Sequence, residues 1–68
     1  MIDARGLSCP QPVLLVQRAV KKDAPALVEV VVDNETAVQN IRRFAKAVGY
    51  SFEVAEDAGE YKLKLMKA

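Results

Sequence analysis

The stretch Leu27–Val32, which reads LVEVVV, decides the fold. Four of its six residues are valine, and β-branched side chains favour extended backbone over helix. A short run of this kind, bounded by turn-forming residues, is typical of a strand. The sequence therefore predicts a central strand here, with one segment before it and one after it that have the pattern of helices.

An amphipathic helix is predicted ahead of this strand, over residues 12–22, and Asp23-Ala24-Pro25 ends it. Its apolar positions recur with the spacing of one helix face: Val13, Val16 and Val20. Residues 1–4 alternate apolar and polar side chains, as a half-buried strand would. Gly6 in the connection between them is free to take a positive φ.

A second helix is predicted after the central strand. Asp33-Asn34-Glu35-Thr36 supplies candidates for its N-cap and acids for its first turn. Gly49 is the expected residue just past its end. The apolar stripe of this helix contains Val38, Ile41, Ala45 and Val48, with Phe44 beside it.

Two alternating strands are predicted over residues 51–56 and 60–66, joined by a turn at Asp57-Ala58-Gly59. Their apolar positions are Phe52 and Val54 in the first strand and Tyr61, Leu63 and Leu65 in the second. The order β-α-β-α-β-β predicts an α/β (α+β) two-layer sandwich, with two helices on one face of a mixed four-stranded sheet. The first two strands are expected to be parallel, which brings the loops that follow them to one edge of the sheet.

Size and composition narrow the classes of function. The 68 residues are expected to form one domain, residues 1–68. Ten lysines and arginines against nine acids give a net charge of +1, and the cations are dispersed rather than gathered into a phosphate-binding stripe. The longest strongly apolar run, residues 13–16, is far too short to span a membrane. With one cysteine and no histidine, neither an internal disulfide nor a protein-only zinc site is expected. We expect a cytoplasmic protein without a metal or cofactor.

The single cysteine, Cys9, lies in the connection between the first strand and the first helix. Unpaired N–H groups and the dipole of a helix N-terminus favour the thiolate, which is the reactive form. With Cys9 as N-cap, Pro10 and Pro12 occupy positions that lack an N–H, so Gln11 is the one backbone donor left for the sulfur. Because Pro12 biases Gln11 away from helical ψ, the helix can also begin one or two residues later.

The chain offers Cys9 no histidine base and no second cysteine, so it lacks the parts for hydrolysis or dithiol oxidoreduction. Carrying a group covalently remains open to it. Arg5 would favour the thiolate if it lay near the sulfur, whereas Asp33 and Glu35 would oppose it. On general grounds we expect Arg5 in a surface position or a loop salt bridge, and Asp3 bonded to loop amides.

Seven residues together fit the signature Asp-x-Arg-Gly-Leu-x-Cys-Pro-x-Pro: Asp3, Arg5, Gly6, Leu7, Cys9, Pro10 and Pro12. In this signature and in its order of helices and strands, the chain resembles the TusA/SirA/YedF sulfur-carrier family, and most closely the N-terminal domain of YedF-like proteins. The resemblance implies that Cys9 accepts sulfane sulfur as a persulfide. It also implies that Pro10 and Pro12 fix the helix start, while Gly6 and Leu7 shape and anchor the loop.

The same resemblance implies two kinds of protein partner. The donor would be a cysteine desulfurase or a rhodanese-like protein, and the acceptor a DsrE-like protein or a tRNA-thiolation relay. We expect a monomeric carrier rather than a complete stand-alone enzyme. YedF-like proteins usually continue into a second domain, so the chain is either a stand-alone homologue or an excised domain.

Two alternatives stay open: a non-catalytic regulatory or interaction module, including RNA binding, and an accessory domain of selenium metabolism. Near-neutral charge weighs against nucleic acid. Arg42, Arg43 and Lys46 are expected to form a solvated helix face, with a docking patch for an acidic partner as the less favoured interpretation. Lys62 and Lys64 are expected on the polar face of an exposed strand, where lysine discourages edge pairing.

Overall fold

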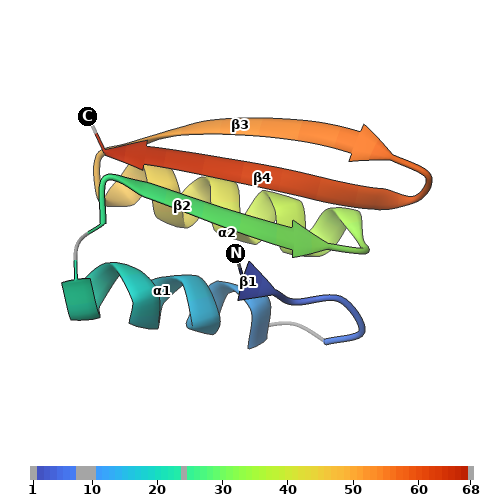
Figure 1. Ribbon diagram of the computed structural model, residues 1–68, viewed down its shortest axis with the longest axis horizontal. Helices are drawn as coiled ribbons and strands as arrows, with labels where there is room; N and C mark the ends of the chain where they lie inside the picture. The colour runs from blue at the N-terminus through green and yellow to red at the C-terminus, as the bar shows by residue number, and fades with distance from the viewer. Residues whose placement is uncertain (1, 8–10, 24, 68) are drawn as a thin grey trace.

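A four-stranded sheet forms one layer of the protein and two helices form the other (Figure 1). The computed structural model describes residues 2–7, 11–23 and 25–67. In chain order the elements are β1 (Ile2–Asp3), α1 (Gln11–Asp23), β2 (Leu27–Val32), α2 (Glu35–Ala47), β3 (Tyr50–Asp57) and β4 (Glu60–Lys67). The predicted order of elements and the predicted two-layer fold are confirmed.

The strands lie in the order β1-β2-β4-β3. β1 runs parallel to β2, and the other two neighbouring pairs are antiparallel. The LVEVVV stretch is therefore an interior strand, as predicted. The interpretation that Lys62 and Lys64 protect a sheet edge is wrong, because β4 lies between β2 and β3. Both lysines are exposed on the helix-free face, while the alternate residues of β4 are buried beneath them.

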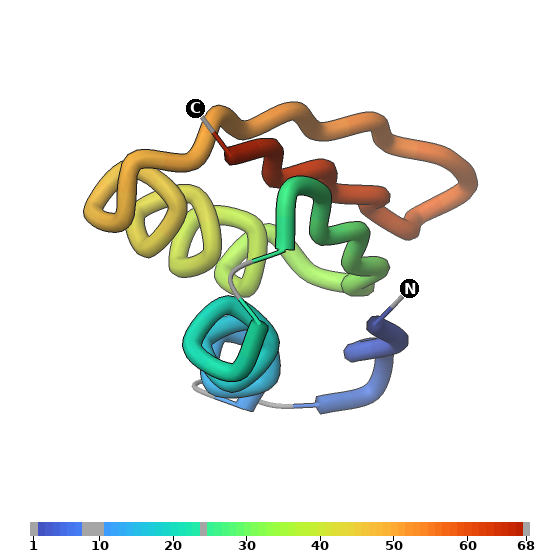
Figure 2. Tube along the Cα trace, turned by 60° about the vertical axis from the view of Figure 1, so that its left-hand side comes forward, coloured from blue at the N-terminus to red at the C-terminus, as the bar shows by residue number. Residues whose placement is uncertain are grey.

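The core lies between the sheet and the helices, which Figure 2 shows on the same side of the sheet. α1 packs against β2 and α2, and α2 packs against β3 and β4. Val28, Val30 and Val32, which are alternate residues of β2, point into this layer and are almost completely buried. The largest fully buried side chains are Ile41, Leu63, Leu65, Val16, Val30, Val32 and Pro12. In the part of the chain described, neither helix has the length and apolar character to cross a membrane.

Both ends of α2 follow the predicted signals. The Asn34 side chain caps the N-terminus, and its Oδ1 accepts a hydrogen bond of 2.8 Å from the Ala37 N–H. At the other end Gly49 has φ +81°, a left-handed conformation that glycine adopts without strain. The prediction that Val48 belongs to the buried stripe is wrong. It is 42% exposed because the helix ends at Ala47 and Val48 is its C-cap.

The β3–β4 hairpin turns through Ala58 and Gly59, both at positive φ, which fits a two-residue type I′ turn. The turn end of the hairpin extends past α2 (Figure 1). β3 is also an edge strand, so its second half is uncovered, and Val54 is 50% exposed. Phe52 and Val54 lie on the same face of β3, as the predicted alternation implies, but Phe52 is half-buried and Val54 is exposed.

The cap of α2 can be tested by substitution. Replacing Asn34 with alanine removes the acceptor for the Ala37 N–H and should lower the free energy of unfolding by about 1 kcal/mol, as measured by urea denaturation. Asn34→Asp retains an acceptor oxygen and should recover most of this loss. Gln39→Ala, at an exposed position of the same helix, serves as the control. A loss in the control equal to that in Asn34→Ala would contradict the capping role.

Candidate functional site

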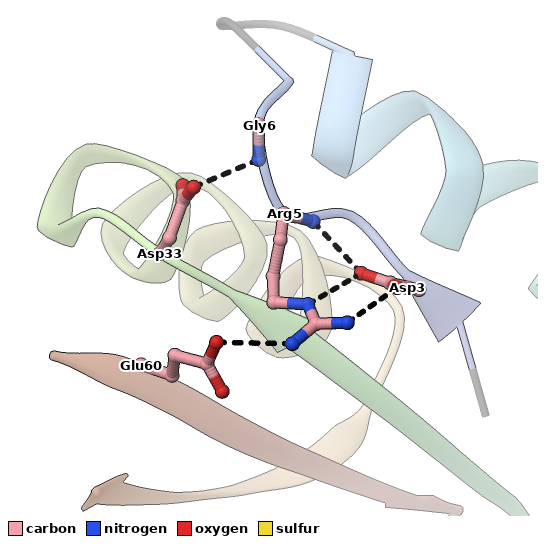
Figure 3. A network of polar contacts seen from close by, with 5 residues as sticks. All are labelled: Asp3, Arg5, Gly6, Asp33 and Glu60. Atoms are coloured by element: carbon pink, nitrogen blue, oxygen red, sulfur yellow. Dashed lines mark hydrogen bonds and ion pairs between the residues drawn. The ribbon is translucent and has the colours of Figure 1, made fainter. Parts of the chain in front are cut away.

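Two loops meet at the carboxyl ends of β1 and β2 (Figure 3). The Ala4 N–H donates to the Val31 carbonyl at 2.9 Å, which continues the pairing of β1 with β2 past the end of the strand. Two residues later the Gly6 N–H donates to Asp33 Oδ2 at 2.8 Å. The predicted meeting of these loops at one edge of the sheet is thereby confirmed by a direct contact.

Asp3 and Arg5 form the second anchor of the loop. Asp3 Oδ1 accepts from the Arg5 backbone N–H at 3.1 Å and from Arg5 Nε at 2.9 Å, and Oδ2 accepts from Arg5 Nη2 at 2.9 Å. Arg5 Nη1 donates to Glu60 Oε2 at 3.0 Å. Asp3 therefore bonds a loop amide and Arg5 lies in a loop salt bridge, as expected from the sequence.

The Arg5 side chain links β1 to β4 across β2. Asp3 belongs to β1 and Glu60 to β4, and β2 lies between them, so the guanidinium crosses β2 on the helix-free face (Figure 3). Glu60 was not identified from the sequence. The signal that locates it is the antiparallel register of β2 against β4, which pairs Val32 with Tyr61 and so brings Glu60, the residue before Tyr61, to the end of β2. That register exists only because β4 lies beside β2, and no local sequence motif predicts which strands are neighbours.

These contacts determine the charges at the site. The donors of Arg5 lower the pKa of Asp3 to about 2, its side chain contributing more than its backbone N–H. The two carboxylates raise the pKa of Arg5 further above its ordinary value. The charge of Arg5 is therefore balanced by Asp3 and Glu60 rather than left free. All three side chains are at least 40% exposed, so the network positions the loop more than it stabilises the fold.

Asp33 connects the loop to the start of α2. Its pKa is lowered mainly by the Gly6 N–H and next by Asn34 Nδ2, which donates to Asp33 Oδ1 at 3.1 Å. Gly6 has φ +76°, and a Cβ placed there would have no neighbour within 4 Å. The predicted positive φ is confirmed, and the backbone conformation rather than lack of space requires glycine here.

The second stem of the loop leads into α1. Leu7 is half-buried against the core and Pro12 is buried, while Gln11 is exposed. A hollow of about 310 Å³ opens beside this stem; it is lined by Leu7, Gln11, Leu14, Leu15 and Arg18. Buried or half-buried residues therefore hold the chain on both sides of residues 8–10.

Cys9 and Pro10 lie outside the described residues. The N-cap role of Cys9 and the donation from Gln11 to its sulfur therefore stay predictions. The remaining residues predicted for the site fall on the two stems: Asp3, Arg5, Gly6 and Leu7 on the first, and Gln11 and Pro12 on the second.

The lowered pKa of Asp3 predicts a pH dependence of stability. Because the folded-state pKa of about 2 lies below the ordinary value of about 3.9, the contribution of Asp3 is complete above pH 5 or so and is lost as the pH falls toward 2. The difference in unfolding free energy between the wild type and Asp3→Asn should therefore shrink over that interval. Urea denaturation as a function of pH measures it, and a constant difference would refute this role of Arg5.

The Asp33 anchor predicts a local effect. Asp33→Ala removes the acceptor for the Gly6 N–H and should accelerate hydrogen exchange of the Gly6 amide about tenfold, as measured by NMR. Asp33→Asn retains an acceptor oxygen and should exchange more slowly than the alanine variant. Equal exchange rates in wild type and Asp33→Ala would show that this hydrogen bond does not hold the loop.

The chain is similar to known proteins in both sequence and overall fold. A sulfur carrier protein TusA from Pseudomonas paraeruginosa is 33% identical over 63 residues, which is 90% of this chain and 80% of that protein. The crystal structure of a SirA-like protein from Desulfitobacterium hafniense superimposes with a TM-score of 0.88 at 34% identity, covering 96% of this chain and 92% of the other. The sequence profile of the family described as Sulfurtransferase TusA matches residues 1–67. The chain belongs to the TusA sulfurtransferase family.

Proposed function

We propose that this protein is a sulfur carrier that holds sulfane sulfur on Cys9 as a persulfide and passes it to an acceptor protein. Membership of a family whose relatives are named sulfur carriers supports the role. The observation that carries the assignment to this loop is its double anchoring. Gly6 is bonded to Asp33 on one side and Pro12 is buried on the other, so a reactive side chain between them is presented from fixed stems.

The proposed step needs no base and no redox partner within the chain. The Cys9 thiolate attacks the outer sulfur of a persulfide on the donor protein, a new S–S bond forms at Cys9, and the donor cysteine leaves as a thiolate. Transfer to the acceptor repeats the exchange, with an acceptor thiolate as the nucleophile and Cys9 as the leaving group. The atoms and electrons balance because a neutral sulfur atom moves between thiolates.

The start of α1 suits an anionic sulfur. No acidic residue lies in the first turn of α1, whereas α2 begins with Glu35. The partial positive charge at this helix end is therefore not neutralised by a local carboxylate and favours a thiolate or persulfide placed before it. Arg5 acts indirectly in this proposal, since Asp3 and Glu60 balance its charge.

The proposal includes the partners that such a step requires. A cysteine desulfurase or rhodanese-like protein supplies the sulfur, and a DsrE-like protein or a tRNA-thiolation relay removes it. We place the relay in the cytoplasm, where a lone thiol stays reduced. A monomeric carrier can present the same thiol to the two partners in turn.

Incubation with a cysteine desulfurase and cysteine tests the proposal. The intact mass of the wild type should increase by one sulfur atom, and dithiothreitol should remove the increase because it reduces the persulfide. Cys9→Ser provides the control and should gain nothing. Absence of the adduct in the wild type, or equal loading of Cys9→Ser, would overturn the assignment.

A further inference from the structure

A groove of about 540 Å³ lies between α2 and β3, on a part of the molecule that the proposed sulfur chemistry does not use. It is lined by Arg42, Lys46, Tyr50, Phe52 and Val54. The two cations stand one helical turn apart on α2, and the other three residues are successive helix-facing positions of β3. None of the lining residues is acidic, so the groove has an apolar floor and a basic wall.

The floor of the groove is also the edge of the sheet. β3 is the last strand in the order β1-β2-β4-β3, and among the described residues no strand pairs with its outer side. Its eight residues pair with β4 in unbroken register, without a bulge, and contain neither lysine nor proline. The other edge strand, β1, has only two residues. The edge at β3 is therefore long and regular, it lacks the lysine, proline or bulge that often protects a free edge, and its only charged residues are the acids Glu53, Glu56 and Asp57.

The hydrogen-bond pattern shows which main-chain groups face outward. The Lys67 N–H donates to the Ala26 carbonyl at 2.8 Å, so Lys67 directs its main-chain groups toward the β2 side of β4. Because successive residues of a strand alternate in this direction, Met66 directs its groups toward β3 and pairs with Ser51. The residues of β3 whose N–H and C=O groups point to the free edge are the alternate ones: Tyr50, Phe52, Val54 and Glu56.

Tyr50, Phe52 and Val54 direct their main-chain groups to the free edge, and the same three residues line the groove. A polypeptide that paired with the free edge of β3 would thus lie along the groove, and alternate side chains would point toward α2. There they would meet Phe52, which is half-buried, and Val54, which is 50% exposed. Carboxylates on the same side of that polypeptide would face Arg42 and Lys46.

We infer that this groove is a docking site for an extended acidic segment of a partner protein, which adds to β3 as a fifth strand. An apolar side chain of the segment rests on Phe52 and Val54, and its carboxylates pair with Arg42 and Lys46. Strand addition distinguishes this occupant from RNA, which has no row of amides and carbonyls to match the edge of β3.

A second copy of the chain suits the groove less well. In the antiparallel register centred on Ala55, Glu53 of each copy would lie opposite Asp57 of the other, and like charges on paired strands are destabilising. The groove also lies at the opposite edge of the sheet from β1, which leads into the loop that contains Cys9. A partner bound to β3 therefore leaves the β1 edge of the sheet uncovered. The inference does not require the sulfur-carrier proposal, and its test measures no sulfur transfer.

The probe is a synthetic seven-residue peptide with blocked ends. It has threonine at its odd positions, glutamate at the second and sixth positions and valine at the fourth. Titration into the isotope-labelled protein should shift the amide resonances of β3 and of residues 42–46, with a dissociation constant of about 0.1–1 mM. Amide exchange of Phe52 and Val54 should slow, because their N–H groups face the added strand. No shift at millimolar peptide would overturn the inference.

Substitutions on the two helices separate specific docking from general charge attraction. Arg42→Glu should weaken binding about tenfold, while Arg18→Glu, an identical change at an exposed position of α1, should leave it within about twofold. Replacement of both glutamates of the peptide by lysine should abolish binding. Equal loss of peptide affinity in the two protein variants would show that binding depends on net charge alone, which would contradict the proposed site.

Two further outcomes would assign the groove to a different occupant. N-methylation of the peptide at either its odd or its even positions should abolish binding in one of the two series, because strand addition uses every second N–H. Retained binding in both series would exclude strand addition. Tighter binding of a single-stranded RNA octamer to the same residues, or a salt-sensitive dimer lost in Arg42→Glu, would replace the peptide by RNA or by a second copy.

Discussion

The pairing of β1 with β2 is the constraint on which the rest of the structure depends. β1 has two residues, too few to hold a parallel strand in place by themselves. The pairing continues beyond the strand through the Ala4–Val31 hydrogen bond and the contact of Gly6 with Asp33. Arg5 then bridges Asp3 to Glu60 across β2. The shortest strand of the sheet is thus fastened by its own outgoing loop, so the loop is part of the fold rather than an attachment to it.

Local signals in the sequence predicted most of the fold. The Asn34 cap, the Gly49 end of α2 and the LVEVVV strand each depend on residues within a few positions of one another, and each is confirmed. Errors arose where the place of a residue depends on distant elements. Lys62 and Lys64 were expected to discourage edge pairing, but the place of β4 between β2 and β3 depends on the strand order and not on a local pattern.

In the candidate site, too, the sequence predicted the residues that a local motif contains and missed the one that depends on a distant strand. The Asp-x-Arg-Gly-Leu motif identified Asp3 and Arg5, whose contacts with each other lie within the motif, and Gly6, whose positive φ follows from its being glycine. Glu60 escaped notice since it is 55 residues from Arg5 and reaches it through the β2–β4 register. The two edges of the sheet also differ in a way that composition did not predict. β1 is short and leads into the anchored loop, whereas β3 is long and open.

Position 6 requires glycine because of its backbone angle and not because a larger side chain would lack space. Its φ of +76° is the mirror image of the angle that L-residues prefer, and the space around its missing side chain is empty. A residue of D-configuration would adopt this φ without backbone strain, whereas an L-residue would not. Among genetically encoded amino acids, the achiral one alone adopts this angle freely, so the identity of position 6 is set by chirality.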